Sequence, residues 1–327
     1  MQFNRRHFLA ASAATATAAA LPSRAAFAQT AHDMARIIVG FPAGTTPDVL
    51  ARKVGDRLAK GYANAVMVDN RAGAGGQLAV TTVKGAAPDG TTILLTPMSI
   101  LGVYPFTYKR LPYDPVADLS PVSMGVSFDY GIAVGPGVPE SVKTIHDLMT
   151  WFKANPSQAN MGSPATGSTL HFMTVMLGRA AGFNLTHVGY KGSGPAMQDM
   201  LGGTLPALCS PLGTFLNQPR LRVLASSGAK RSRFTPNVPT LAEQGFKDLV
   251  YDEWYGFFLP AKSSAASVTK LNAALRDALA DKDIVDTLAT FGMEATPSSP
   301  EKLAASLKDD MNKWGPIVKS IGFSADT

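Results

Sequence analysis

Three loops that lead into predicted helices carry small and hydroxyl-bearing residues. They are residues 45–48, 162–169 and 191–195, and each follows a short apolar run typical of a strand. The start of a helix leaves backbone N–H groups without partners and carries the positive end of the helix dipole, so it suits an anion. Loops after parallel strands gather at one edge of the sheet, where ligands of such folds bind. The sequence therefore predicts an anion-binding site built from loops.

The first two of these loops offer backbone amides and hydroxyl groups rather than charged side chains. Neither contains an arginine, so a guanidinium clamp from these segments is excluded. Asp48 would repel a carboxylate, and we expect it to orient a water molecule or the loop itself. The alternative is that these residues only cap their helices. The residues expected to approach the anion, in these two loops and directly before the first of them, are Ala43, Gly44, Thr45, Thr46, Gly162, Ser163, Gly167, Ser168 and Thr169.

Signals of catalysis are weak. No serine lies in a Gly-x-Ser-x-Gly elbow, and we interpret His171, one turn after Ser168, as a residue of a helix face. His146, His171 and His187 lack metal-ligand spacing, and the single cysteine, Cys209, is interpreted as a buried apolar residue. A dinucleotide loop at Gly73 is incomplete, because Leu78 stands where its third glycine belongs. We expect no cofactor, no metal and no catalysis, with an exported α/β hydrolase or cofactor enzyme as the alternative.

Strand and helix patterns alternate along the chain, as in a parallel sheet with helical crossovers. Strands are predicted at 37–39, 66–68, 91–95, 131–134, 160–163, 186–188 and 221–225, the last one crossing between lobes. Helices are predicted at 47–60, 144–153, 169–181, 195–201, 268–280 and 300–318, with another ending at Lys84. The aromatic run 254–258 is interpreted as core. The chain should form two α/β lobes, one from residues 29–124 and 223–327 and the other from residues 125–222.

The first 28 residues have the pattern of an export signal. Arg5-Arg6 precedes a weakly apolar stretch, and Ala26-Phe27-Ala28 has the small-x-small form of a cleavage site. We expect a twin-arginine signal cleaved near Ala28 and a periplasmic protein, an ordinary secretory signal being the alternative. The net charge of +6 includes three arginines of this segment, so the mature chain carries +3. It contains no dense basic run, and nucleic acid is not an expected partner.

Several motifs, in order, resemble those of the Bug extracytoplasmic solute receptors of tripartite tricarboxylate transporters. The resemblance covers essentially the whole mature chain. Its segments are Phe41-Pro42-Ala43-Gly44 with Asp48, Asn70-Arg71-Ala72-Gly73-Ala74-Gly75-Gly76, Ala87-Pro88-Asp89-Gly90, Leu111-Pro112-Tyr113-Asp114-Pro115, Tyr190-Lys191-Gly192-Ser193, Val238-Pro239-Thr240 with Glu243, and Trp254-Tyr255-Gly256.

The resemblance implies a two-lobed periplasmic binding protein of α/β class, type II-like, in which each lobe is a parallel-rich sheet flanked by helices and a hinge joins the lobes. It implies a small carboxylate ligand, membrane-embedded transporter subunits as partners, and a monomer. A ligand sensor for a signalling kinase stays as an alternative. Serine replaces a common acidic residue at Ser210, which disfavours ligands with an ammonium group. The predicted ligand contacts are Phe41, Ala43, Gly44, Thr45, Thr46, Asp48, Ser99, Gly162, Ser163, Gly167, Ser168, Thr169 and Ser210.

Overall fold

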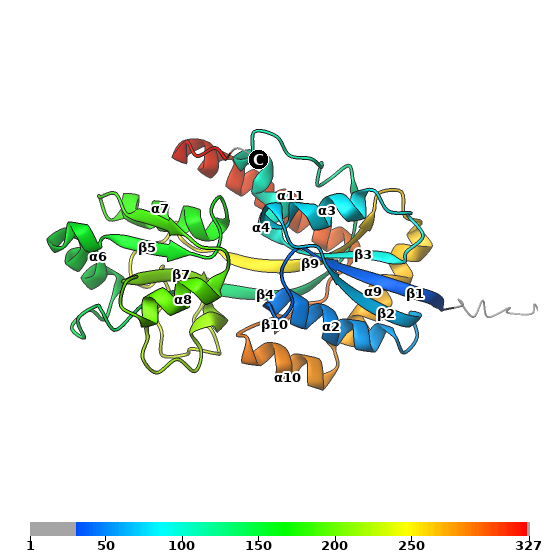
Figure 1. Ribbon diagram of the computed structural model, residues 1–327, viewed down its shortest axis with the longest axis horizontal. Coiled ribbons are helices and arrows are strands. Elements are labelled where there is room, and N and C mark those ends of the chain that lie inside the picture. The colour runs from blue at the N-terminus through cyan, green and yellow to red at the C-terminus, as the bar shows by residue number, and fades with distance from the viewer. Residues whose placement is uncertain (1–30, 326–327) are drawn as a thin grey trace, which may run out of the picture. The chain divides into compact units, whose positions relative to one another are not determined.

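The computed structural model describes residues 31–325. Its strands join in the order β2-β1-β3-β9-β4-β7-β5-β6, with β10 and β8 also paired to β4. The bounds of the strands are β1 His32–Val39, β2 Ala63–Asn70, β3 Thr92–Pro97, β4 Leu119–Val134, β5 Asn160–Ser163, β6 Thr186–Gly189, β7 Ala207–Pro211, β8 Arg222–Ser226, β9 Asp252–Pro260 and β10 Glu294–Ala295. Figure 1 shows β4 running from one group of strands to the other. The expected export signal lies outside the described residues.

The long strand β4 divides this sheet into two parts. Residues 119–129 of β4 pair with β9, and residues 130–134 pair with β7. We call the part with β1, β2, β3, β9 and β10 the first lobe, and the part with β5, β6, β7 and β8 the second lobe. Within each lobe a parallel core, β2-β1-β3 or β7-β5-β6, carries the predicted loops. This agrees with the expected fold class, while the predicted lobe boundaries stay a prediction.

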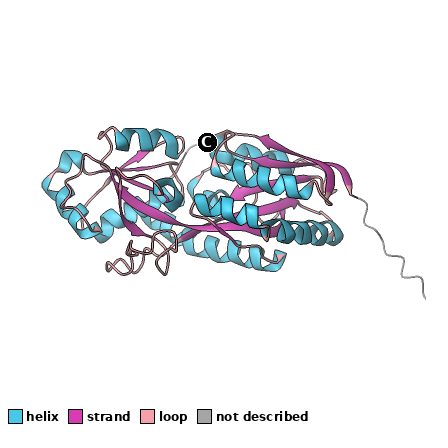
Figure 2. Ribbon diagram, turned by 90° about the horizontal axis from the view of Figure 1, so that it is seen from below, coloured by secondary structure: helices cyan, strands magenta, loops and turns pink. Residues whose placement is uncertain are grey.

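Helices flank the strands in both lobes (Figure 2). In the first lobe α2 contains Pro47 in its first turn and buries Leu50, Val54 and Leu58, which lie at helical spacing, where the sequence predicted a helix over 47–60. The helices are α2 Thr46–Leu58, α3 Gln77–Lys84, α4 Met98–Gly102, α5 Tyr104–Thr107, α6 Ile145–Ala154, α7 Thr169–Ala180, α8 Ser193–Leu201, α9 Ala265–Leu279, α10 Lys282–Thr290 and α11 Pro300–Ile321, with short 3-10 turns at Ala74–Gly76, Pro156–Gln158 and Leu212–Phe215.

Two strands differ from the sequence-based expectation. The aromatic run is part of β9, a central strand between β3 and β4 in which every residue after Asp252 is buried. A strand covered on both faces shows no alternation of apolar and polar residues, so its periodicity gives no strand signal. The strand predicted at 221–225 is β8, but it pairs with residues 131–134 of β4 inside the second lobe. The continuous strand that crosses between the lobes is β4.

The helix α11 also contacts both lobes. Trp314 is 1% exposed, and its ring lies 4.7 Å from the ring of Tyr251 and 6.3 Å from that of Phe172 on α7. Arg179, near the end of α7, donates hydrogen bonds to the carbonyl oxygens of Ser320 and Ile321, at 3.1 and 3.3 Å. These carbonyls lie at the negative end of the α11 dipole, so the cation is well placed there. The end of α11 therefore supports the helix whose start carries predicted ligand contacts.

Candidate functional site

The first lobe brings the segments after three parallel strands to one sheet edge, and one of these segments holds the predicted loop 45–48. Strands β1, β2 and β3 are parallel, so the segments that follow them leave the sheet at the same side. A side chain at Gly40 would lie 2.8 Å from the Cα of Gly76, which only glycine allows. The Asn70 amide donates to the carbonyl of Phe41 at 3.0 Å. Ser99 lies at the start of α4, directly after β3. Phe41, the loop 43–46 and Ser99 therefore belong to one edge.

Asp48 holds the first loop in place. Its carboxylate accepts hydrogen bonds from the Gly44 amide at 2.8 Å, the Asn70 amide at 2.9 Å and the Arg52 guanidinium at 3.0 Å. Burial opposes its ionisation, but the bonds from Arg52, Gly44 and Asn70 outweigh burial and keep its pKa below the usual value. Asp48 is 2% exposed and therefore acts on the loop from beneath. Ala43 and Gly44 are exposed, and Thr45 and Thr46 are half-buried.

The structure predicts the consequence of removing this carboxylate. In Asp48→Ala the Gly44 and Asn70 donors lose their partner, so we expect the free energy of unfolding to fall by about 1–3 kcal/mol, measured by urea denaturation. Asp69→Ala is the matched control, because Asp69 makes a more exposed ion pair with Arg71 at 2.9 Å. Such pairs contribute about 0–1 kcal/mol. Equal losses in the two variants would contradict the role assigned to Asp48.

The second lobe gathers its own loops in the same way. The parallel strands β5, β6 and β7 place residues 164–168, 190–192 and 210–215 at one edge. The Ser168 hydroxyl donates to the Ala165 carbonyl at 2.7 Å and does not cap α7. Gly167 has φ +77°, a conformation that glycine adopts readily, and its amide donates to Nδ1 of His171 at 3.2 Å. Side chains of this loop thus bond mostly within the loop, while Gly162, Ser163, Ser168 and Thr169 are all buried.

Histidines lie beneath this loop in the neutral form. The Ser163 hydroxyl lies 2.7 Å from Nε2 of His187, whose ring is 3.9 Å from that of His171. Burial lowers the pKa of His171 to about 4, and burial together with His171 lowers that of His187 to about 3. Ser163 is fully buried and therefore poorly placed as a nucleophile. Among residues 31–325 no group of three or more His, Cys, Asp or Glu side chains could hold a metal ion.

Three hydroxyl groups meet at the next strand of this edge. Ser210 lies 3.0 Å from the Ser193 hydroxyl at the start of α8 and 3.0 Å from that of Thr214. Ser210 is buried, whereas Ser193 and Thr214 are half-buried. The sequence predicted that Ser193 lies in a loop before a helix, but no sequence pattern indicated Thr214. The position occupied by Ser210 therefore presents a neutral, hydroxyl-lined surface.

A buried carboxyl group that sequence reasoning missed joins the two edges. Glu253, at the start of β9, accepts a hydrogen bond from the Ser99 amide at 3.0 Å and one from the Tyr130 hydroxyl at 2.5 Å. The Thr169 hydroxyl, at the start of α7, donates to the same carboxyl oxygen as Tyr130 at 3.2 Å. Its only sequence signal is a pair of acidic residues, Asp252 and Glu253, before an aromatic run. The predicted contacts Ser99 and Thr169 thus meet at one side chain.

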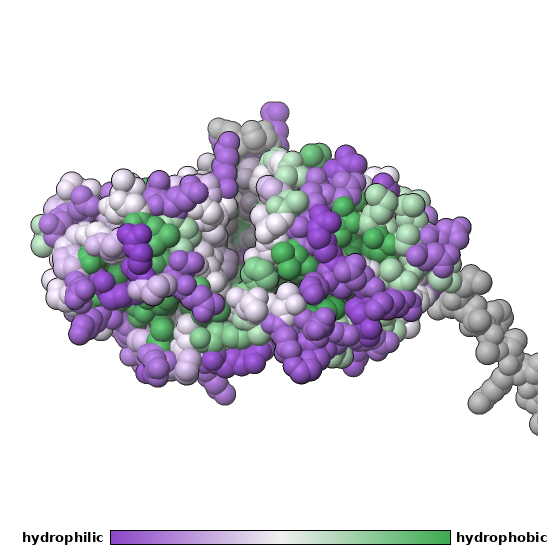
Figure 3. Space-filling model, turned by 60° about the horizontal axis from the view of Figure 1, so that its bottom comes forward, coloured by the Kyte–Doolittle hydropathy of each residue, from purple (hydrophilic) through white to green (hydrophobic). Residues whose placement is uncertain are grey.

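Figure 3 shows the surface hollowed between the lobes. Two further cavities lie elsewhere: one of about 390 Å³ beside Arg57 and Lys270, and one of about 680 Å³ beside Phe106 and Phe323. Neither is lined by a predicted ligand contact. The arrangement of facing loop edges is that of a protein that encloses a small molecule between two lobes.

Comparison with known proteins identifies the family. The family model described as "Tripartite tricarboxylate transporter family receptor" matches residues 50–323. The chain belongs to this receptor family. A curated relative, protein BugT of Bordetella pertussis, is 31% identical over 291 residues, which are 88% of this chain and 89% of BugT. The predicted membership of the Bug receptors is confirmed. Since the family consists of receptors, the chain is a binding protein and not an enzyme.

Two solved structures from Rhodopseudomonas palustris share the fold of this receptor. Rpa4515, solved with adipate, has a TM-score of 0.82 and 27% identity, over 90% of this chain and 98% of its own. MatC, solved with bound malate, has a TM-score of 0.77 and 25% identity, over 87% and 98% of the two chains. Both match nearly the whole described part, which supports the two-lobed fold.

The export signal is confirmed by a second match. A twin-arginine translocation signal sequence matches residues 2–22, so this receptor is exported to the periplasm. Among residues 31–325, none of the helices combines the length and the apolar character that crossing a membrane requires.

Proposed function

We propose that this receptor binds a small organic carboxylate between the facing loop edges of its two lobes and delivers it to membrane-embedded transporter subunits. The observation that carries the proposal is the start of α7. There the Ser168 hydroxyl bonds to the Ala165 carbonyl, which leaves the first amides of the helix without a side-chain cap. Free helix-start amides are favourable donors for a carboxylate. The adipate and malate of the two related structures support this ligand class.

The proposed ligand carries no ammonium group. An ammonium held between the lobes needs a negative counter-charge. At Ser210 the chain offers only the hydroxyls of Ser193 and Thr214, and Asp48 is already bonded to three donors. A dicarboxylate, or another acid without an ammonium group, therefore fits better than an amino acid. We further propose that the receptor acts as a monomer, with lobes formed by residues 29–124 plus 223–327 and by residues 125–222.

Thermal-shift screening of the mature protein tests the proposal directly. A carboxylate present at about a hundredfold above its dissociation constant should add roughly 2.7 kcal/mol to the free energy of unfolding. Succinate, malate and adipate form the first panel, with their amino-substituted or amide analogues as negative ligands. Failure of every carboxylate to shift the melting temperature would overturn the proposed ligand class. Uptake of the same carboxylate by cells that lack the receptor gene separates a transport role from presentation to a sensor kinase.

Two glycines make a matched pair for locating the site. Gly44 has φ +81° and Gly203 has φ +82°, and a side chain at either position would meet nothing within 4 Å. Valine is therefore strained equally at both, but only at position 44 does it project from a predicted ligand loop. In the same screen Gly44→Val should lose the ligand-induced shift and Gly203→Val should retain it. A full shift in Gly44→Val would show that the ligand binds elsewhere.

A further inference from the structure

The carboxyl group of Glu253 is bonded from both lobes at once. One of its oxygens accepts from the backbone amide of Ser99, at the start of α4 in the first lobe. The other accepts from the hydroxyls of Tyr130, on the second-lobe end of β4, and Thr169, on α7. The two hydroxyls also lie 2.5 Å from each other. A single side chain thus connects β9, α4, β4 and α7.

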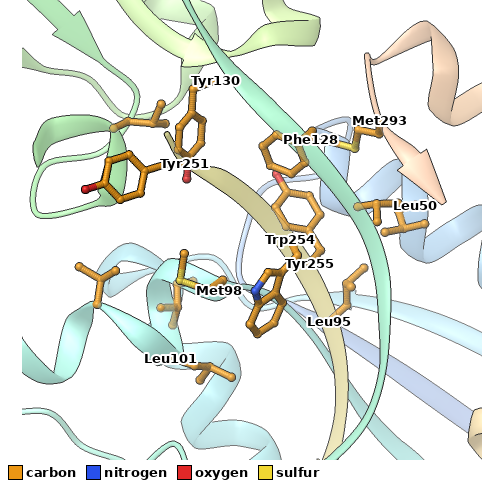
Figure 4. Close-up of a cluster of buried hydrophobic side chains, with 14 of the residues drawn as sticks. Leu50, Leu95, Met98, Leu101, Phe128, Tyr130, Tyr251, Trp254, Tyr255 and Met293 are labelled. Carbon is orange, nitrogen blue, oxygen red and sulfur yellow. The ribbon is translucent and has the colours of Figure 1, made fainter. Parts of the chain in front are cut away.

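Burial makes these bonds difficult to exchange for water. Glu253 is 4% exposed, Tyr130 and Thr169 are each 1% exposed, and Ser99 is 8% exposed. Figure 4 shows Tyr130 and Phe128 on β4, with Tyr255 of β9 beside Phe128. The Phe128 ring lies 5.0 Å from that of Tyr255 and 6.3 Å from that of Tyr130, edge to face in both pairs. In such surroundings a polar group that loses its partner is strongly disfavoured, so the bonds of Glu253 restrict rotation of one lobe against the other.

We infer that Glu253 is a positioning residue for the ligand: it fixes the start of α7 in the second lobe relative to the start of α4 in the first. This inference rests on the proposed function. Glu253 lies outside the ligand loops, but it sets the spacing between Ser99 and Thr169. Removing the polar group of Glu253 releases α7 from α4 and lets the lobes sample a wider range of separations. Closing the ligand loops on a carboxylate then costs more conformational entropy, which weakens binding.

The distance between the lobes tests this inference without any ligand. Spin labels are attached to Asp56→Cys on α2 and Gln198→Cys on α8, both exposed positions, and the distance distribution is measured by pulsed electron resonance. The native Cys209 is fully buried and is not labelled. Glu253→Met and Thr169→Val should broaden the distribution. Glu253→Gln should keep a distribution close to that of the parent, because its amide retains an acceptor for Ser99 and a polar group for Tyr130.

Asp310→Asn is the matched control. Asp310, on α11, is a half-buried carboxyl group that accepts a hydrogen bond from Nε1 of Trp254, a first-lobe residue, at 2.8 Å. Its replacement should leave the distribution unchanged. The inference is overturned if Glu253→Met and Thr169→Val match the parent, or if Glu253→Gln broadens as much as Glu253→Met. Should Glu253→Met fail to fold, Thr169→Val decides alone.

Titrating the same Glu253 variants with adipate and malate tests whether the distance between the lobes affects ligand affinity. Glu253→Met should bind whichever acid the parent binds at least several-fold more weakly, and Glu253→Gln should bind it like the parent. Thr169→Val is used only for the distance, because Thr169 is itself a predicted ligand contact. If the parent binds no carboxylate while the distances still respond, the proposed ligand is wrong and the role of Glu253 in lobe spacing stands. Broadened distances with unchanged affinity would overturn the positioning role.

Discussion

Replacing Trp314 with alanine is expected to lower the free energy of unfolding by about 3–5 kcal/mol, the range for fully buried large aromatic side chains. Trp314 is 1% exposed and packs on Tyr251, before β9, and on Phe172 of α7. Its removal leaves a cavity among elements of both lobes, which cannot all move to fill it. Urea denaturation of the mature protein, followed by circular dichroism, measures the loss.

Trp151 provides the control for this prediction. It lies on α6 in the second lobe, is half-buried, and packs on the ring of Phe152 at 5.4 Å. Because part of its surface already meets water in the folded protein, Trp151→Ala should lose less stability than Trp314→Ala. A similar loss in both variants would indicate that Trp314 does not hold the junction of α7 and α11 together.

Local signals explain which parts of the fold could be predicted from the sequence. The helix α2 has a proline at its first turn and apolar residues at helical spacing, and both signals are contained in one short segment. The strand β9 lacks such a signal, because its burial on both faces depends on neighbours far along the chain. The full length of β4 was missed for a different reason: residues 122–130 do alternate apolar side chains with small or polar ones, as in a strand, but only the apolar run at 131–134 was interpreted as one.

The sequence indicated which loops lie at the sheet edges, but not the hydrogen bonds that their residues form. Residues 43–46 and 162–169 do lie at the carboxyl ends of parallel strands, as the alternation of elements indicated. Whether the Ser168 hydroxyl meets a ligand or the Ala165 carbonyl depends on the backbone of one loop, which residue types do not fix. Glu253 was inaccessible to sequence reasoning because its three partners lie on α4, β4 and α7. That its side chain joins both lobes emerges only from the folded chain.

The titration of Glu253 should make the stability of the protein depend on pH. Burial raises the pKa of Glu253 to about 7, while hydrogen bonds from Tyr130, Ser99 and Thr169 act in the opposite direction. In the unfolded chain the group loses its proton near pH 4.5. Between these two values the unfolded state binds fewer protons, so raising the pH favours unfolding. Across this window the parent should lose on the order of 3 kcal/mol relative to Glu253→Gln, which cannot ionise.

Comparison of variants isolates this effect from other titrating groups. The buried His171 and His187 have lowered pKa values and therefore make stability rise with pH, but they are present in parent and variant alike and cancel in the difference. Asp310→Asn is the control: burial raises the pKa of Asp310 to about 6, so its difference from the parent should level off near pH 6 and that of Glu253→Gln near pH 7. Urea denaturation at half-unit steps from pH 4.5 to 8 resolves the two curves. A difference between parent and Glu253→Gln that stays constant over this range would mean that Glu253 ionises as readily in the folded protein as in the unfolded chain, and that burial does not govern the cluster.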